Sequence, residues 1–223
     1  MTRRPTMSEL IWPDDDELPK RWAEGVTERI LDWTWRAFDE FSQKHLATVD
    51  LTQPLEQLER DLVRQHFIEI QILFSVETDG YSSLIPHHEW PEMESRSSAP
   101  AKPPAYDLAY VCERNRRWAW PIEAKVLPSP GALAEYLKDV NEKFVKGIAS
   151  PLAGEGGMVG YLLSEDTTTC LTNLEKKLGK QLNIVDAFKE RCHRTSKHTR
   201  KDAPNLRLHH MIMVCLERSL ETV

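Results

Sequence analysis

Residues 105–111, Ala-Tyr-Asp-Leu-Ala-Tyr-Val, and residues 120–127, Trp-Pro-Ile-Glu-Ala-Lys-Val-Leu, decide the fold of this chain. Both segments are mainly apolar, and each predicts a β-strand. A short polar stretch, residues 113–117, separates them and predicts a turn centred near Asn115. We therefore expect an antiparallel hairpin, in which alternate side chains of each strand share a face.

The predicted register brings two carboxylates together. With the turn at Asn115, Asp107 lies roughly opposite Glu123, and directly opposed side chains are about 5 Å apart. Carboxylates at that distance repel each other unless a positive charge lies between them. Hard cations such as Mg²⁺, for which Mn²⁺ can substitute, favour carboxylate oxygens. Lys125 shares a strand face with Glu123 and would add a fixed positive charge.

These residue types are those needed to hydrolyse a phosphodiester. A metal polarises the phosphate and lowers the pKa of a bound water, and a lysine can stabilise the developing charge or orient that water. We expect Asp107, Glu123 and the carbonyl of Ala124 to hold the metal, with Lys125 as a catalytic residue. The alternative is an exposed strand face with a surface Glu/Lys pair.

Pro104, Asp107 and the triplet Glu123-Ala124-Lys125 resemble the motif of the PD-(D/E)xK nuclease superfamily, although the proline lies three positions before the aspartate. The resemblance covers roughly residues 55–216. It implies an α/β (α+β) fold with a restriction-endonuclease-like αβββαβ core, a mixed central sheet flanked by helices. It also implies a metal-dependent nuclease acting on DNA, in bacterial restriction or anti-phage defence. Further matching segments are Lys143-Phe144, Gly156-Gly157, residues 158–161 (Met-Val-Gly-Tyr), residues 196–200 and His209-His210.

A helix predicted from Pro54 to Phe74 could supply another carboxylate. At 3.6 residues per turn, Glu59, His66 and Glu69 fall within its apolar face, where an unpaired carboxylate is costly. The resemblance implies a glutamate from this helix beside the metal, so we expect Glu59 to be catalytic, with Glu69 as second choice. A glutamate at the stripe edge, with its carboxylate in solvent, fits the pattern equally well.

The other elements follow from periodicity. We expect residues 1–50 to form a tail and a tryptophan-rich helix, which is an N-terminal extension, and residues 51–223 to form the nuclease-like domain. The apolar stripe of the first helix would pack on that domain or on another protein. Further helices are expected at 20–46, 132–149 and 171–188, and further strands at 82–89, 158–163 and 206–216.

The net charge of −6 argues against a broadly basic nucleic-acid binder. Contacts to a phosphate backbone of DNA, or of RNA, must come from local clusters. One is the turn at 114–117, and the other is the tract at 191–201, which is expected to be a loop. The tract residues expected to bind nucleic acid are Arg194, Lys197, His198 and Arg200. The alternative is that this loop is only solvated surface and contacts no phosphate.

Four scattered cysteines without a CxxC pair suit a reducing cytoplasm. No apolar run long enough for a membrane span is present, so we expect a cytoplasmic protein without membrane contact. The alternative function is a non-catalytic interaction subunit that docks to a helicase or ATPase through its N-terminal helix. A homo-oligomer is compatible with the sequence.

Overall fold

The fold is α/β, with one mixed sheet between helices. The computed structural model describes residues 25–78, 84–92, 105–113 and 115–216, and these contain a seven-stranded sheet of order β1-β2-β3-β4-β7-β6-β5. The strands are β1 (Leu84–Pro91), β2 (Ala105–Cys112), β3 (Ala119–Leu127), β4 (Glu155–Leu162), β5 (Asn183–Ile184), β6 (His193–His198) and β7 (Leu206–Val214). The helices are α2 (Val26–Lys44), α3 (Leu55–Thr78), α4 (Ala134–Asp139), which continues as a π-helix over Val140–Val145, and α5 (Thr167–Leu178).

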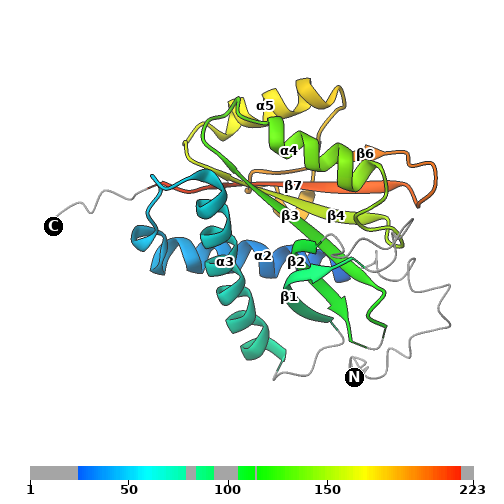
Figure 1. The fold of residues 1–223 in the computed structure, drawn as a ribbon, viewed down its shortest axis with the longest axis horizontal. Helices are drawn as coiled ribbons and strands as arrows, with labels where there is room; N and C mark the ends of the chain where they lie inside the picture. The colour runs from blue at the N-terminus through cyan, green and yellow to red at the C-terminus, as the bar shows by residue number, and fades with distance from the viewer. Residues whose placement is uncertain (1–24, 79–83, 93–104, 114, 217–223) are drawn as a thin grey trace.

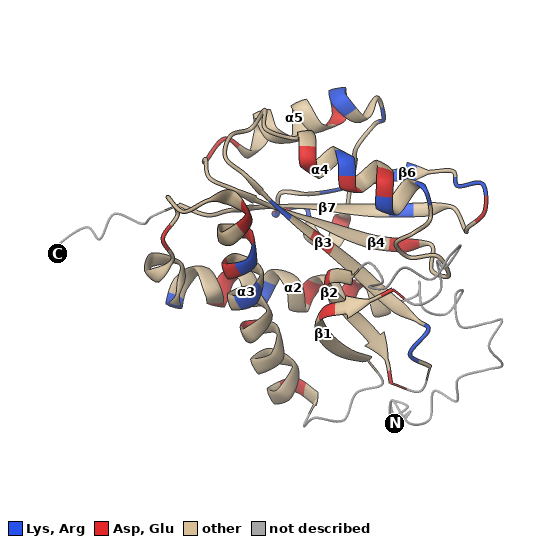
Figure 2. Ribbon diagram, in the orientation of Figure 1, with Lys and Arg blue, Asp and Glu red and all other residues tan. Residues whose placement is uncertain are grey.

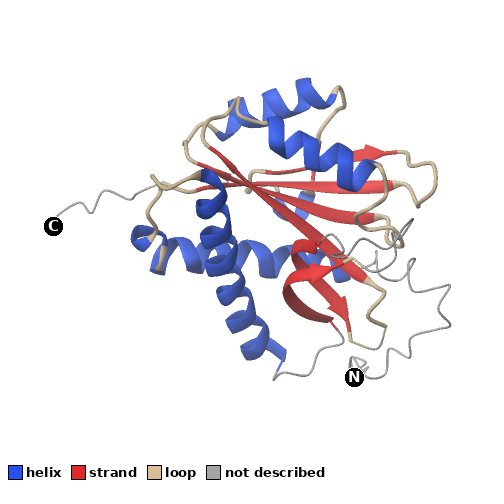
Figure 3. Cartoon of the chain, in the orientation of Figure 1, coloured by secondary structure: helices blue, strands red, loops and turns tan. Residues whose placement is uncertain are grey.

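Helices cover both faces of the sheet. Figure 3 shows α2 and α3 on one side of the strands, with α4 and α5 on the other. The apolar face of α2 is buried in the same hydrophobic core as α3 and the central strands. The tryptophan-rich stripe therefore packs inside the protein itself, while residues 1–24 lie outside the described part of the chain. The buried aromatic side chains of α2 are Trp33, Trp35, Phe38 and Phe41.

β3 is the strand on which the two halves of the sheet meet (Figure 1). Its first half pairs antiparallel with β2, from Val111 opposite Ala119 to Leu108 opposite Ile122. This register confirms the predicted turn at Asn115. Its second half pairs in parallel with β4. The pairing of β3 with β2 ends at Ile122. From Glu123 onward, no described residue of β2 pairs with β3, so this edge of β3 is open.

The helix after β3 lies close to the sheet because glycine makes room for it. Phe144, in the π-helix, packs over Gly156 of β4, where an added Cβ would lie 2.6 Å from the ring. Atoms cannot approach so closely without a shift, so this position requires the missing side chain. The close approach places α4 against β3 and the π-helix against β7.

Two expectations about the second half of the chain were wrong. The helix expected at 171–188 ends at Leu178, because Gly179 adopts a left-handed conformation with φ of 61° and caps it. The tract expected to be a loop at 191–201 contains β6, which pairs with β7 on one side and β5 on the other. Four of the six residues of β6 are buried, whereas a surface loop would expose most of them.

No helix among the described residues combines the length and apolarity that crossing a membrane requires. The four cysteines are free thiols, and three of them are buried.

His66 of α3 is fully buried between the helices and the sheet. Its Nε2 lies 2.7 Å from the carbonyl oxygen of Thr34, and its Nδ1 lies 2.9 Å from the hydroxyl of Tyr161. Nε2 therefore carries the proton and donates a hydrogen bond to the carbonyl oxygen of Thr34, and Nδ1 accepts a hydrogen bond from the hydroxyl of Tyr161. Burial lowers the pKa of His66 from 6.5 to about 4. The neutral imidazole is the form that the fold accommodates.

We predict that His66 makes the protein sensitive to acid. The unfolded chain binds a proton near pH 6.5 and the folded chain near 4, so stability is lost as pH falls through this window. Full protonation would remove on the order of 3 kcal/mol. Urea unfolding of wild type and His66→Gln should show a stability difference that shrinks from neutral pH toward about 5. A difference that stays constant with pH would contradict this assignment.

Candidate active site

The open edge of β3 is hydrogen-bonded by side chains instead of by a neighbouring strand. The N–H of Ala124 donates to Oδ2 of Asp107 at 2.7 Å, and its carbonyl accepts from Nζ of Lys125 at 2.7 Å. The N–H of Val126 donates to Oε2 of Glu59 at 3.4 Å. Backbone polar groups in a fold must be paired. The side chains of Asp107, Lys125 and Glu59 therefore supply the hydrogen bonds that a continued β2 would otherwise make.

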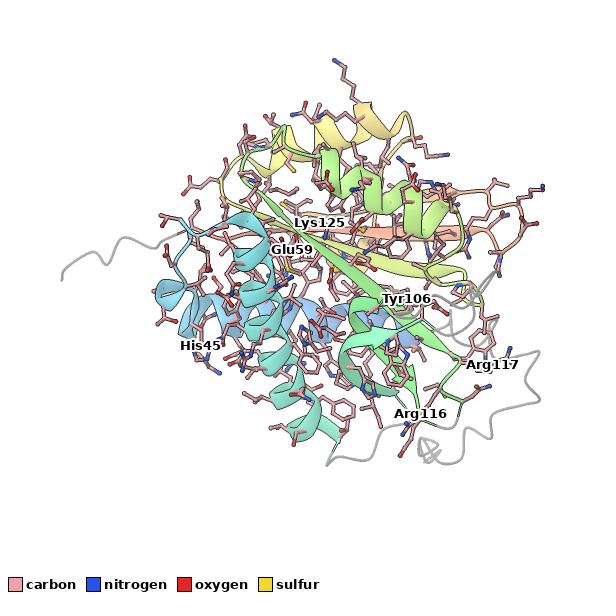
Figure 4. All side chains as sticks on the ribbon, in the orientation of Figure 1. His45, Glu59, Tyr106, Arg116, Arg117 and Lys125 are labelled. Carbon is pink, nitrogen blue, oxygen red and sulfur yellow. The ribbon has the colours of Figure 1, made fainter. Side chains whose placement is uncertain are left out.

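Glu59 reaches this edge from α3, which lies on the opposite face from α4. Its Oε1 lies 2.7 Å from Nζ of Lys125, with side chains 22% and 17% exposed. Figure 4 shows the two residues next to each other where β3 passes α3. Glu69, the second choice from the sequence, lies elsewhere and pairs with Lys44 and His45. The structure thus brings Glu59, and not Glu69, to the predicted strand residues.

Two further residues of the site were missed by the sequence analysis. Nζ of Lys143, in the π-helix, lies 2.6 Å from Oε2 of Glu123 and 3.2 Å from Oδ2 of Asp139. Nζ of Lys125 lies 3.3 Å from the same Asp139 oxygen. Asp139 and Lys143 are four positions apart, so a helix at 132–149 predicts that they share a face. Their position over β3 depends on tertiary packing, which the periodicity does not reveal.

The centre of the cluster is buried, and the cluster carries an excess of negative charge. Glu123 is 1% exposed and Asp139 is 8% exposed. Four carboxylates, of Glu59, Asp107, Glu123 and Asp139, surround two ammonium groups, those of Lys125 and Lys143. With every group ionised, two negative charges remain unbalanced. A buried uncompensated charge is strongly unfavourable, so the site attracts either protons or cations.

The pKa values of the cluster follow from this excess. Burial raises the pKa of Glu123 well above its ordinary value, and the charge of Asp107 raises it further. Burial also raises the pKa of Glu59, although Lys125 opposes this effect. For both lysines burial favours the neutral amine, but the neighbouring carboxylates outweigh it and raise the pKa. Both lysines are therefore charged at neutral pH.

The donor set fits a divalent cation. Carboxylate and carbonyl oxygens are the ligands that Mg²⁺ prefers, and Asp107, Glu123 and Ala124 offer both kinds at the open edge of β3. A charge of +2 would balance the two unpaired negative charges. Among the described residues, no group of three or more His, Cys, Asp or Glu side chains is arranged to hold a metal. A metal here would use two strand carboxylates, the Ala124 carbonyl and water, and Mg²⁺ typically keeps several waters.

The expectation that Arg200 and His198 bind nucleic acid is not supported by their positions. Arg200 is buried, and its guanidinium donates to the carbonyls of Pro204, Ala149 and Ala153 at 2.5, 3.2 and 2.9 Å. His198 is buried too, with Nε2 at 2.7 Å from the hydroxyl of Ser196. His198 is the last residue of β6, which lies within the sheet, and Arg200 bonds to carbonyls of neighbouring loops, so both side chains stabilise the fold.

Other basic residues remain exposed. Lys197 is exposed on β6, and Arg194 is half-buried with its guanidinium on the carbonyl of His193. Arg116 and Arg117 are exposed at the β2–β3 turn, far along the hairpin from Lys125 in Figure 4. Figure 2 shows Lys and Arg positions interspersed with Asp and Glu along the helices. Arg114 lies outside the described residues.

We compared the chain with protein-family models, with curated proteins and with solved structures, and none of the three comparisons gave a match.

We predict that Arg200 is a structural residue. Arg200→Ala would leave several buried carbonyls without donors, so it should cost about 3 kcal/mol or more of unfolding free energy. Lys197→Ala, on an exposed position of the same tract, should stay within about 0.5 kcal/mol of wild type. Chemical denaturation of the two variants provides the comparison. Equal stability of the two variants would contradict the structural role of Arg200.

Proposed function

We propose that this protein is a metal-dependent nuclease that hydrolyses phosphodiester bonds, with DNA as the expected substrate. The observation that carries the proposal is the convergence of Asp107, Glu123, Lys125 and Glu59 at the open edge of β3. These four residues come from three separate elements, and each was expected to be catalytic from the sequence alone. Random surface pairs would not be expected to meet in one partly buried cluster.

Each residue has a role that its contacts support. Asp107, Glu123 and the Ala124 carbonyl would hold a divalent cation, which when bound polarises the phosphate and lowers the pKa of a coordinated water. The ammonium of Lys125 would stabilise negative charge on the phosphate oxygens or orient the attacking water. Glu59 fixes that ammonium by an ion pair of 2.7 Å and would contact the cation through water.

The order of elements supports the same proposal. The succession α3, β1, β2, β3, α4, β4 gives the αβββαβ arrangement that the resemblance to PD-(D/E)xK nucleases implies. A shared fold does not establish activity, so the proposal depends on the site residues. A role in bacterial restriction or anti-phage defence is part of this proposal, and it comes from the resemblance.

The central test is cleavage of labelled DNA with Mg²⁺ or Mn²⁺. Asp107→Asn, Glu123→Gln and Lys125→Met should each reduce the cleavage rate by about a hundredfold or more, because the first two remove a ligand of the cation and the third removes the ammonium that acts on the phosphate. Circular dichroism should show that the variants are folded. Glu135→Gln and Lys138→Gln alter an exposed ion pair on α4 and should cleave like wild type. Undiminished cleavage by Glu123→Gln would contradict the proposal.

A second prediction separates the two glutamates of α3. Glu59→Gln should raise the metal concentration needed for half-maximal cleavage, because the cation loses a nearby negative charge and Lys125 loses its ion-pair partner. Outer contacts of this kind change metal affinity by about 10- to 100-fold. Glu69→Gln, which alters a pair with Lys44 and His45, should leave the metal requirement unchanged. The reverse result would assign the role to Glu69.

The alternative, a non-catalytic subunit that docks through its N-terminal helix, has less support. The aromatic face of α2 packs in the core of the protein, so it cannot bind a partner unless the core opens. If no metal produces cleavage of DNA or RNA, by the isolated chain or with a helicase or ATPase present, the non-catalytic alternative would be favoured.

A further inference from the structure

Lys143 occupies a position that is unusual for a lysine. Its ammonium lies between two buried carboxylates, at 2.6 Å from Glu123 and 3.2 Å from Asp139. The side chain of Lys143 is 30% exposed, whereas that of Glu123 is 1% exposed. The carboxylate is therefore fixed inside the fold, while the long, flexible lysine can move its charged end toward solvent at little cost.

Asp139 is bound incompletely by these lysines. Its Oδ2 lies within ion-pair distance of both ammonium groups, at 3.2 and 3.3 Å. The same buried atom nevertheless accepts no hydrogen bond from any described residue. The distances show ion pairs, but the angles at which the ammonium groups approach this oxygen do not suit a hydrogen bond. A buried acceptor without a donor is costly, so Oδ2 retains the capacity to bind a cation.

The backbone at this point is irregular as well. α4 ends at Asp139, and the π-helix that follows, Val140–Val145, contains Lys143. π-Helical turns are rare, and they occur frequently at functional sites. Asp139 and Lys143 belong to this junction and face the same strand carboxylate. The irregular turn thus provides both an additional carboxylate, that of Asp139, and the ammonium of Lys143 that pairs with it.

We infer that Lys143 is a displaceable counter-ion for the metal site and that Asp139 is an additional carboxylate of that site. This inference rests on the proposed function only for the identity of the cation. In the protein without metal, the ammonium of Lys143 fills the cation position between Glu123 and Asp139. A divalent cation binding at Glu123 displaces it, and Asp139 then faces the cation directly or through water. The released lysine, still charged, is available to a phosphate oxygen of the substrate.

The test is the affinity for Mn²⁺, measured by isothermal titration calorimetry on the full chain without nucleic acid. Asp139→Asn should weaken binding by about tenfold or more, as the loss of a supporting carboxylate does. Lys143→Gln should tighten binding, because the cation no longer competes with a resident charge; a change of about tenfold is expected for one unit charge at this separation. The opposite signs of the two effects identify a competing counter-ion.

Matched controls come from the same helix. Lys146 forms an exposed ion pair with Glu142, so Lys146→Gln removes an equal charge one turn away and should leave the affinity unchanged. If Lys143→Gln weakens Mn²⁺ binding or leaves it unchanged, Lys143 only positions Glu123 and the inference fails. If Asp139→Asn does not fold, Asp139→Ser and Lys143→Gln still give opposite signs when the inference is correct.

Failure of the inference can be separated from failure of the proposed function. If wild-type protein binds Mn²⁺ with the expected variant effects but cleaves no nucleic acid, the nuclease proposal fails and the counter-ion role stands. If the protein cleaves DNA, and Asp139→Asn and Lys143→Gln bind Mn²⁺ like wild type, the inference alone is overturned. Absence of Mn²⁺ binding by wild type and by Lys143→Gln overturns both.

Discussion

The organisation of the site depends on the early separation of β2 from β3. Where the pairing ends, after Leu108 and Ile122, the backbone groups of Ala124 and Val126 lose their strand partners. Unpaired backbone groups inside a fold are costly, and here Asp107, Glu59 and Lys125 replace the missing strand. The same hydrogen bonds that complete the edge of the sheet also hold the proposed catalytic side chains in place.

A second constraint is the charge enclosed by this arrangement. α3 and α4 cover opposite faces of the sheet, yet both reach the edge of β3. α3 contributes the carboxylate of Glu59, α4 contributes that of Asp139, and the π-helix contributes the ammonium of Lys143. The lysines reduce the repulsion among the carboxylates without balancing it. A fold selected only for stability would replace such a cluster with apolar residues, since buried ion pairs seldom improve on hydrophobic packing. The excess negative charge is consistent with a site that is completed by a cation.

His66 and Arg200 serve the fold. His66 bonds Thr34 to Tyr161, and Arg200 joins the loops around Pro204 and Ala153. Both are polar residues of types that also occur in catalytic and binding sites. Their contacts show instead how buried polar groups are satisfied.

The sequence by itself determined the two strands and the turn between them that centres at Asn115, because strand alternation is a local property. Helical periodicity placed both Glu59 and Glu69 on the apolar face of α3, and only the structure separated the two by bringing Glu59 to Lys125. The sequence did not determine the end of α5 at Gly179, although a glycine at that position is a recognisable helix-capping signal. Only the tertiary structure decided that residues 193–198 form an inner strand and that Asp139 and Lys143 lie over Glu123. Those positions depend on which elements pack together, and packing joins residues that no sequence period connects.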